Sequence, residues 1–244
     1  MNVLDLFSGI GGFSLGLERA GMRTVAFCEI DAKARKVLAE HWPGVPIFDD
    51  VRTIDHAGSN ARVICGGFPC QDVSNANAVW GECAGLAGER SGLWRELLRA
   101  IRVVRPDFAI VENVAALLGR GLAEVLGDLA SIGYDAEWCC IRASDLGAPH
   151  DRDRIYIIAY PIGSRGPRLV TSADFSAAGS WGLRSQADMQ SVINAPFERG
   201  HSWPEPLVRR MDDGIPGRVD RLHGVGNAVV PQIPEIIGRA IMAL

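Results

Sequence analysis

Short apolar runs alternate with helix-like segments over the first 160 residues of the chain. The apolar runs predict buried strands at residues 2–7, 24–28, 62–65, 108–111 and 155–160. Between them, apolar residues at helical spacing predict helices at residues 12–20, 32–41, 93–104 and 122–132. Strands separated by helices of about 10–15 residues are typical of βαβ units, whose parallel sheet is covered on both faces. The pattern therefore predicts an α/β fold with a doubly wound, mostly parallel sheet.

The pattern changes after residue 160. Residues 161–190 are rich in Gly, Ser, Ala and Pro and have no sustained period, which indicates either a loop-rich region or a partly mobile one. The last segment, residues 231–244, is amphipathic and predicts a helix. The chain thus predicts one α/β body with a small, loop-rich second region.

Composition narrows the class of protein. The 244 residues are 48% hydrophobic and 22% charged, with a mean hydropathy of +0.09, as in a globular domain with a sizeable core. These values exclude disordered, collagen-like and disulfide-rich miniproteins. No apolar run reaches the roughly 18–20 residues that span a bilayer, and the N-terminus lacks the basic stretch of a signal peptide. We therefore expect a cytoplasmic protein whose six cysteines are free thiols.

The charge balance neither supports nor excludes a nucleic-acid partner. Twenty-five basic and 29 acidic residues give a net charge of −4, which argues weakly against one. However, Lys33 and Lys36 are the only lysines, so 23 of the basic residues are arginine. Arginine suits bidentate contacts to phosphate, carboxylate or guanine edges, although an arginine-rich genome gives the same composition.

A glycine-rich turn follows the first predicted strand, at the sheet edge where ligands of such folds bind. Gly9, Gly11 and Gly12 let the backbone approach a ligand closely. Ser14 stands where the G-x-G-x-x-G dinucleotide pattern needs its third glycine, which disfavours a nicotinamide dehydrogenase. A plain turn is the alternative interpretation.

Acidic residues follow the next two apolar stretches. A carboxylate at this position accepts the ribose hydroxyls in other nucleoside-binding sheets, and Glu29 and Asp31 are the candidates. Asp31 suits the N-cap of the next helix, which leaves Glu29 for the sugar. Asp49 and Asp50 come later, and one of them is a candidate acceptor for an adenine amino group.

Cys70 is the strongest candidate for a reactive group. It lies in a loop just past a predicted strand, stiffened by Pro69 and opened by Gly66 and Gly67. Metal binding is not expected, because there is no C-x-x-C pair and the histidines are scattered. Three other cysteines are expected to be inert buried residues: Cys65, Cys139 and Cys140.

Charged residues mark two further strand ends. Glu112 ends an apolar strand, where a carboxylate is costly to bury unless it is paired or protonated. Arg152 and Arg154 precede the last predicted strand and point the same way if the chain is extended there. An exposed ladder of acids and bases is the alternative interpretation of this stretch.

Together these segments resemble the DNA cytosine-C5 methyltransferase family. The similar segments, in the family's order, are residues 5–12, Glu29, Asp50, Pro69-Cys70-Gln71, Glu112-Asn113-Val114, Arg152-Asp153-Arg154 and residues 226–231. The match covers about residues 3–160 and 217–240. It implies a Rossmann-like class I methyltransferase fold, with a catalytic and cofactor-binding body of residues 1–160 plus 217–244. Residues 161–216 would form a short target-recognition region.

The resemblance implies methyl transfer from S-adenosylmethionine to C5 of a flipped-out cytosine in double-stranded DNA, leaving S-adenosylhomocysteine. A thiolate added at C6 makes C5 nucleophilic and leaves again afterwards, which is the role implied for Cys70. Glu112 would hold the N3/N4 edge of the base. Arg154 would contact O2, and Arg152 would support the Cys70 loop.

The same resemblance implies a cofactor site. The residues that would bind the cofactor are Phe7, Gly9, Gly11, Glu29, Ile30, Asp50, Pro69, Leu93, Asn227 and Val229. Phe7 would face the adenosine, Glu29 the ribose and Asp50 the adenine amino group. Because the last two residues come from the far C-terminus, we expect the terminal helix to pack against the first part of the chain.

Three features depart from the family's pattern. His150 stands where glutamine is usual, and Ile30 replaces the commoner aromatic residue. The recognition region is unusually short, so we expect a short or degenerate target, or help from a second subunit. Candidate DNA contacts are Arg165, Arg168, Arg184, Arg199, Arg209 and Arg210. We expect a bacterial or phage protein, with or without a cognate nuclease; methylation of cytosine in tRNA and an inactive DNA-binding relative are the alternatives.

Overall fold

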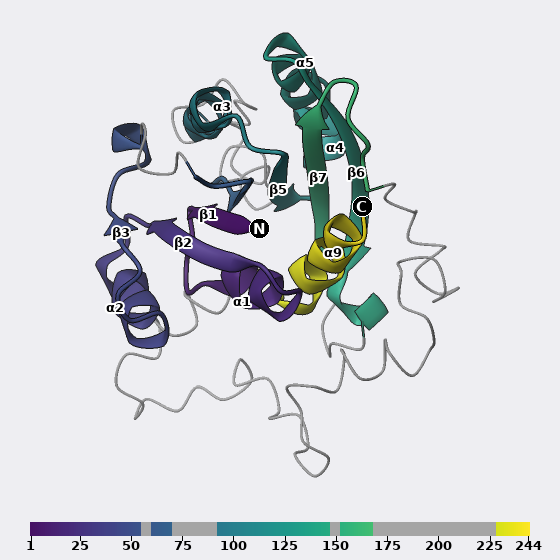
Figure 1. Ribbon diagram of the computed structural model, residues 1–244. Coiled ribbons are helices and arrows are strands. Elements are labelled where there is room, and N and C mark those ends of the chain that lie inside the picture. Colours follow the sequence, from purple (N-terminus) through teal and green to yellow (C-terminus); the bar gives the residue numbers. More distant parts are fainter. Residues whose placement is uncertain (55–59, 70–91, 147–151, 168–227) are drawn as a thin grey trace, which may run out of the picture.

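The computed structural model describes residues 1–54, 60–69, 92–146, 152–167 and 228–244 (Figure 1). Within these ranges the chain forms a seven-stranded sheet in the order β3-β2-β1-β4-β5-β7-β6. The strands are β1 (Asn2–Leu6), β2 (Arg23–Cys28), β3 (Ile47–Phe48), β4 (Val63–Gly67), β5 (Phe108–Val114), β6 (Tyr134–Arg142) and β7 (Asp153–Pro161). The helices are α1 (Gly12–Arg19), α2 (Ala32–His41), α3 (Leu93–Val104), α4 (Leu117–Arg120), α5 (Leu122–Ser131) and α9 (Gln232–Met242), with 3-10 turns η1 (Val51–Thr53) and η4 (Ala143–Leu146).

The sheet is mostly parallel, which confirms the predicted fold class. β1 pairs in parallel with β2 and β4, and the parallel arrangement continues to β3 on one side and β5 on the other. β7 runs antiparallel to both β5 and β6. Because of this reversal, β7 begins at the edge of the sheet where the parallel strands end.

Strand β6 is the long element that the hydrophobic pattern does not predict. It forms the outer strand of the described sheet, where buried positions such as Cys139 and Ile141 alternate with more exposed ones. Trp138, for example, is 45% exposed. A strand covered on one face only has no continuous apolar run, and so lacks the signal that marks the central strands.

Helices cover both faces of the sheet, as predicted, and each face has its own core. Alternate residues of β1 point to opposite faces, so Leu4 lies in one buried cluster and Val3 in the other. The first cluster includes the buried side chains of α3 and α5, such as Leu97. The second includes those of α1 and α9, such as Leu17 and Ile237.

The C-terminal helix α9 packs against α1 (Figure 1), as the sequence predicts. Gly16 permits the close approach, since a Cβ there would collide with the carbonyl oxygen of Pro231. The side chain of Glu235 is buried between two arginines, with Nη2 of Arg239 at 2.8 Å and Nη1 of Arg19 at 4.0 Å. Both ends of the chain therefore belong to one packed unit.

The cysteines of the described ranges are free thiols: Cys28, Cys65, Cys139 and Cys140. Cys65 and Cys139 are buried, as predicted, whereas Cys140 is only partly buried. Burial raises the pKa of the Cys139 thiol to about 12, which leaves it protonated and unreactive. Among the helices of the described ranges, none is long and apolar enough to cross a membrane.

Candidate active site

The structure brings the predicted strand-end residues to one edge of the sheet. The parallel strands end at this edge, and β7 begins there. The strand register pairs Glu112 on β5 with Gly67 on β4, and Val114 on β5 with Arg154 on β7. Strand β5 thus stands between the strand that leads toward Cys70 and the strand that carries Arg154. Cys70 itself lies outside the described residues.

Glu112 is a buried carboxylate with a charged partner. Its side chain is 10% exposed, and its Oε1 lies 2.9 Å from Nε of Arg154. Its Oε2 lies over the β4 backbone, 2.6 Å from the position that a Cβ on Gly67 would take. Burial raises the pKa of Glu112 and outweighs the lowering by the positive charges of Arg154 and Arg152. This carboxyl group therefore holds its proton at a higher pH than an ordinary glutamate does.

Asn113 joins β5 to the segment that precedes Cys70. Its buried side chain donates from Nδ2 to the carbonyl oxygen of Phe68 at 3.1 Å. Its Oδ1 accepts from the backbone amide of Val114 at 2.8 Å. No role for Asn113 follows from the sequence pattern alone, although a polar residue at the end of an apolar strand is the signal that could have identified it.

The turn after β1 has a left-handed backbone at the predicted cofactor residues. Phe7, Gly9 and Gly11 have φ angles of 54°, 53° and 88°. This conformation is unusual for a phenylalanine, and such strain is common at ligand sites. A Cβ on Gly9 would meet no atom within 4 Å, whereas one on Gly11 would lie 2.6 Å from the ring of Trp42. Gly9 is therefore the position where the turn is open, and Gly11 is the position where it packs.

Backbone amides orient the carboxylate of Glu29 at the end of β2. Its Oε2 accepts from the amide of Gly9 at 2.7 Å, and its Oε1 accepts from the amide of Asp31 at 2.8 Å. Asp31 is the N-cap of α2, as predicted, and accepts from the amide of Lys33 at 2.8 Å. Between the two acids, Ile30 is 79% exposed. An oriented carboxylate beside an exposed apolar side chain suits the ribose and base of a nucleoside.

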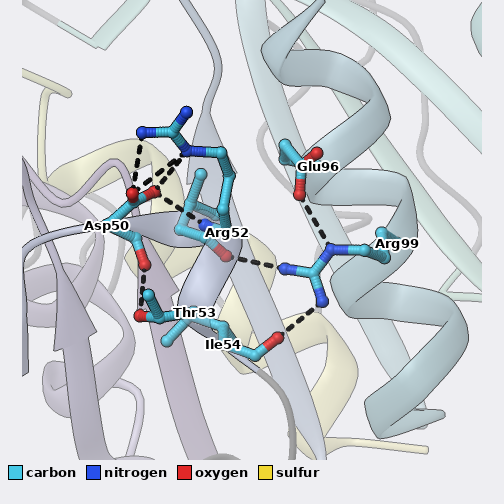
Figure 2. Close-up of polar contacts among 7 residues, drawn as sticks. Asp50, Arg52, Thr53, Ile54, Glu96 and Arg99 are labelled. Atoms are coloured by element: carbon cyan, nitrogen blue, oxygen red, sulfur yellow. Dashed lines mark hydrogen bonds and ion pairs between the residues drawn. The ribbon is translucent and has the colours of Figure 1, made fainter.

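Asp50 follows β3 and begins the turn η1 (Figure 2). Its Oδ1 accepts from the backbone amide of Arg52 at 2.9 Å, and its Oδ2 lies 2.8 Å from Nη2 of the same residue. Hydrogen bonds from Arg52 lower the pKa of Asp50, so the carboxylate is charged at neutral pH. The Arg52 side chain is 69% exposed, so it can turn outward when another donor approaches Asp50.

A buried carboxylate whose role the sequence does not predict holds the start of α1. Asp5 is fully buried, and its Oδ2 accepts from Oγ and N of Ser14 at 2.7 Å and 3.3 Å. Burial raises the pKa of Asp5 to about 7, although the bonds from Ser14 lower it. An aspartate inside an otherwise apolar strand was the sequence signal for this contact.

The remaining predicted residues are placed only in part. The C-terminal segment reaches the glycine turn, since a Cβ on Gly12 would collide with the carbonyl oxygen of Val229. Leu93 begins α3, and Arg165 is exposed beyond the end of β7. Several predicted residues lie outside the described ranges: His150, Arg168, Arg184, Arg199, Arg209, Arg210 and Asn227. No group of His, Cys, Asp and Glu side chains suited to a metal ion occurs among the described residues.

Sequence comparison finds relatives over most of the chain. A family model described as C-5 cytosine-specific DNA methylase matches residues 1–178. The Type II methyltransferase M2.BsuMI of Bacillus subtilis is 37% identical over 167 residues, covering 65% of this chain and 42% of that protein. The Type II methyltransferase M.BanI of Aneurinibacillus aneurinilyticus is 34% identical over 240 residues, covering 91% of this chain and 54% of that protein. The chain thus spans about half the length of these relatives.

Solved structures are similar as well. A putative DNA modification methyltransferase encoded within an E. coli prophage has a TM-score of 0.54 and 28% identity, covering 66% of this chain and 47% of that one. The Dnmt2 methyltransferase of S. pombe has a TM-score of 0.57 at 20% identity, covering 72% of this chain and 54% of that one. This likeness concerns the fold alone. The class I methyltransferase fold expected from the sequence is thereby confirmed. Since the family model matches well over half of the residues of this chain, the chain belongs to the C-5 cytosine-specific DNA methylase family.

Proposed function

We propose that this chain transfers a methyl group to C5 of a cytosine flipped out of duplex DNA, through a transient bond between Cys70 and C6 of the base. The observation that carries the proposal is the ion pair at the sheet edge between the buried Glu112 and the partly buried Arg154, with an Oε1–Nε distance of 2.9 Å. It lies beside Gly67, three residues before Cys70 in the chain. A candidate thiol in the segment after β4, a protonatable carboxyl on the neighbouring β5 and a cation on β7 suit acid-assisted addition to a pyrimidine.

The chemistry needs each of these groups. C5 of cytosine attacks an electrophile poorly until the Cys70 thiolate adds at C6, which moves the electron pair of the C5–C6 bond to C5. The addition puts negative charge on the N3 and O2 side of the ring. A protonated Glu112 can donate to N3, which its raised pKa favours, and Arg154 can stabilise charge at O2. Once C5 has formed its bond to the methyl group, with S-adenosylhomocysteine as the leaving group, loss of the C5 proton expels the thiolate and restores the aromatic ring.

The methyl donor of this reaction is S-adenosylmethionine, which supplies an electrophilic sulfonium methyl group. The described residues fit its adenosine part: Glu29 is oriented by two amides, Ile30 is exposed beside it, and Gly9 faces open space. In the proposal Glu29 accepts from the ribose hydroxyls and Asp50 from the adenine amino group. Phe7, Gly11, Pro69, Leu93, Asn227 and Val229 complete the proposed site.

We propose residues 1–160 plus 217–244 as the catalytic part and residues 161–216 as the target-recognition region. A region this short can hold few side chains against base edges, so the target is expected to be short or degenerate. The relatives named Type II methyltransferases support a role beside a restriction nuclease. A second subunit is the other way to extend the recognition surface, and sizing of the DNA complex distinguishes one chain from two.

The proposal is tested by incubating the full chain with tritiated S-adenosylmethionine and either duplex DNA or tRNA. We expect labelled duplex DNA, with 5-methylcytosine located by bisulfite sequencing. Cys70→Ser should reduce labelling to background, because serine is far less nucleophilic than a thiolate. Cys140→Ser is the matched control, since this partly buried thiol lies on the outer strand β6 and should be dispensable.

A second experiment detects the proposed covalent bond. Duplex DNA containing 5-fluorocytosine cannot lose a C5 proton after methylation, so the adduct should persist on a denaturing gel in the wild type and be missing in Cys70→Ser. Undiminished methylation by Cys70→Ser would contradict the assignment of the nucleophile. Labelling of tRNA but not of duplex DNA would contradict the proposed substrate.

A further inference from the structure

Arg99 on α3 reaches across to the turn that carries Asp50 (Figure 2). Its Nη1 donates to the carbonyl oxygen of Ile54 and its Nη2 to that of Val51, both at 2.7 Å. Its Nε donates to Oε2 of Glu96, one turn earlier on α3, at 2.8 Å. The Arg99 side chain is 26% exposed, so these charge-assisted bonds are partly shielded from water. The guanidinium group is therefore held on three sides.

The anchored backbone directly follows Asp50. The carbonyl oxygen of Asp50 accepts from Oγ1 of Thr53 at 2.7 Å and from the Thr53 amide at 3.0 Å, which closes the turn. The side chains of Val51 and Ile54 are buried in the core on the α3 face of the sheet. Packing of these two side chains sets where the turn lies. The bonds from Arg99 to their carbonyl oxygens set how its backbone is rotated.

We propose that Arg99 is a positioning residue for the adenine end of the cofactor site, because it fixes the turn that aims the Asp50 carboxylate. The inference rests on the proposed function, in which Asp50 accepts from the adenine amino group. A planar guanidinium reaches two carbonyl oxygens at once, which neither an ammonium nor a neutral amide does as well. Arg99 thus acts on ligand selectivity through the backbone and not through a contact of its own.

A purely electrostatic effect on Asp50 is the competing explanation, and the structure supplies a control for it. Nη2 of Arg52 lies 2.8 Å from Oδ2 of Asp50, whereas the bonds of Arg99 go to neighbouring carbonyl oxygens. Both arginines contribute to lowering the pKa of Asp50, and Arg52 contributes most. If charge were the cause, removal of the Arg52 side-chain charge would have the larger effect.

The test compares S-adenosylhomocysteine with its analogue that lacks the 6-amino group, by calorimetric titration of the full chain. In the wild type we expect the analogue to bind about 10- to 100-fold more weakly, as for the loss of a hydrogen bond to a charged group. Asp50→Ala and Arg99→Gln should each reduce this difference to less than about threefold, and the double variant should lose nothing more. Arg99→Lys should lie between wild type and Arg99→Gln.

Two control variants complete the design. Arg102→Gln changes an exposed arginine on the same helix and should retain the full discrimination. Arg52→Gln removes the charge that lies nearer to Asp50 and should also retain the full discrimination between the two ligands. The melting temperature of each variant is measured to check that it folds. If Arg99→Gln does not fold, Arg99→Lys replaces it in the comparison.

The outcomes separate the inference from the function on which it rests. Equal weakening of both ligands in Arg99→Gln, or loss of discrimination in Arg52→Gln, would overturn the positioning role. Equal affinity of the wild type for both ligands would overturn it as well, while leaving the proposed methyl transfer intact. If the wild type bound neither ligand and methylated no DNA, the proposed function would fail first.

Discussion

A single methyl group added to β4 tests the geometry of the proposed active site. In Gly67→Ala the new Cβ would lie 2.6 Å from Oε2 of Glu112, which is 0.4 Å inside the 3.0 Å limit that real Cβ contacts respect (3.0 − 2.6 = 0.4). Glu112 cannot swing away freely, because its other oxygen is paired with Arg154 at 2.9 Å. The carboxylate or the strand must therefore shift.

The expected effect on activity is larger than the effect on stability. Overpacking of this size costs about 1–3 kcal/mol of the free energy of unfolding. A catalytic group misplaced by about 1 Å loses roughly 10²-fold in rate, so we expect kcat/KM for DNA methylation to fall by 10- to 100-fold. Gly127→Ala is the matched control, since nothing lies within 4 Å of a Cβ at that position of α5, and we expect unchanged activity.

A double-mutant cycle shows whether Glu112 is the group that is displaced. In a Glu112→Ala background the methyl group of Gly67→Ala has no carboxylate to meet, so its cost in urea unfolding should fall by about 1–2 kcal/mol. An equal cost of Gly67→Ala in both backgrounds, within about 0.5 kcal/mol, would refute the contact on which the reasoning depends.

Two further predictions concern the framework of the site. The pKa of Asp5 is raised from 3.8 to about 7, so between these pH values the folded chain holds a proton that the unfolded chain has lost. The free energy of unfolding should therefore fall as pH rises through this window, by about 4 kcal/mol at 1.36 kcal/mol per pH unit, and level off above it. Asp5→Asn should remove this slope in urea titrations from pH 4 to 8, and an unchanged slope would assign it to other groups. Gly16→Ala should push α9 off α1 and lower the melting temperature, whereas Gly127→Ala should raise it slightly because alanine favours a helix; a Gly16→Ala protein as stable as wild type would contradict the close packing.

The central strands were predictable because apolar residues follow one another along each of them. β1, β4, β5 and β7 are buried on both faces, so each is a nearly continuous apolar run that local sequence reveals. β6 was not predicted because it is half exposed. The antiparallel direction of β7 was not predicted either, because strand direction depends on the path of the chain between strands. That path is a property of the whole fold and leaves no local pattern.

The candidate site was predictable where one residue carries the signal. Glu112 was identifiable because a carboxylate at the end of an apolar strand demands a partner, and the structure supplies Arg154. Asp31 was assigned as a helix cap for the same kind of local reason, and this is confirmed. Arg99 was not identifiable, since its acceptors are backbone carbonyls 45 and 48 residues away. Backbone acceptors have no sequence signature, so contacts of this kind appear only once the fold is known.

The packing of α9 on α1 has a consequence for how this architecture can diversify. The described residues before 168 and residues 228–244 contribute to the same folded body, so both ends of the connection between them are fixed. The entropic cost of such a connection grows only with the logarithm of its length, and doubling it costs about 0.6 kcal/mol. We therefore expect changes in the length of this connection to cost the fold little stability. Evolution can rewrite that stretch while the strand ends and their side chains stay where they are.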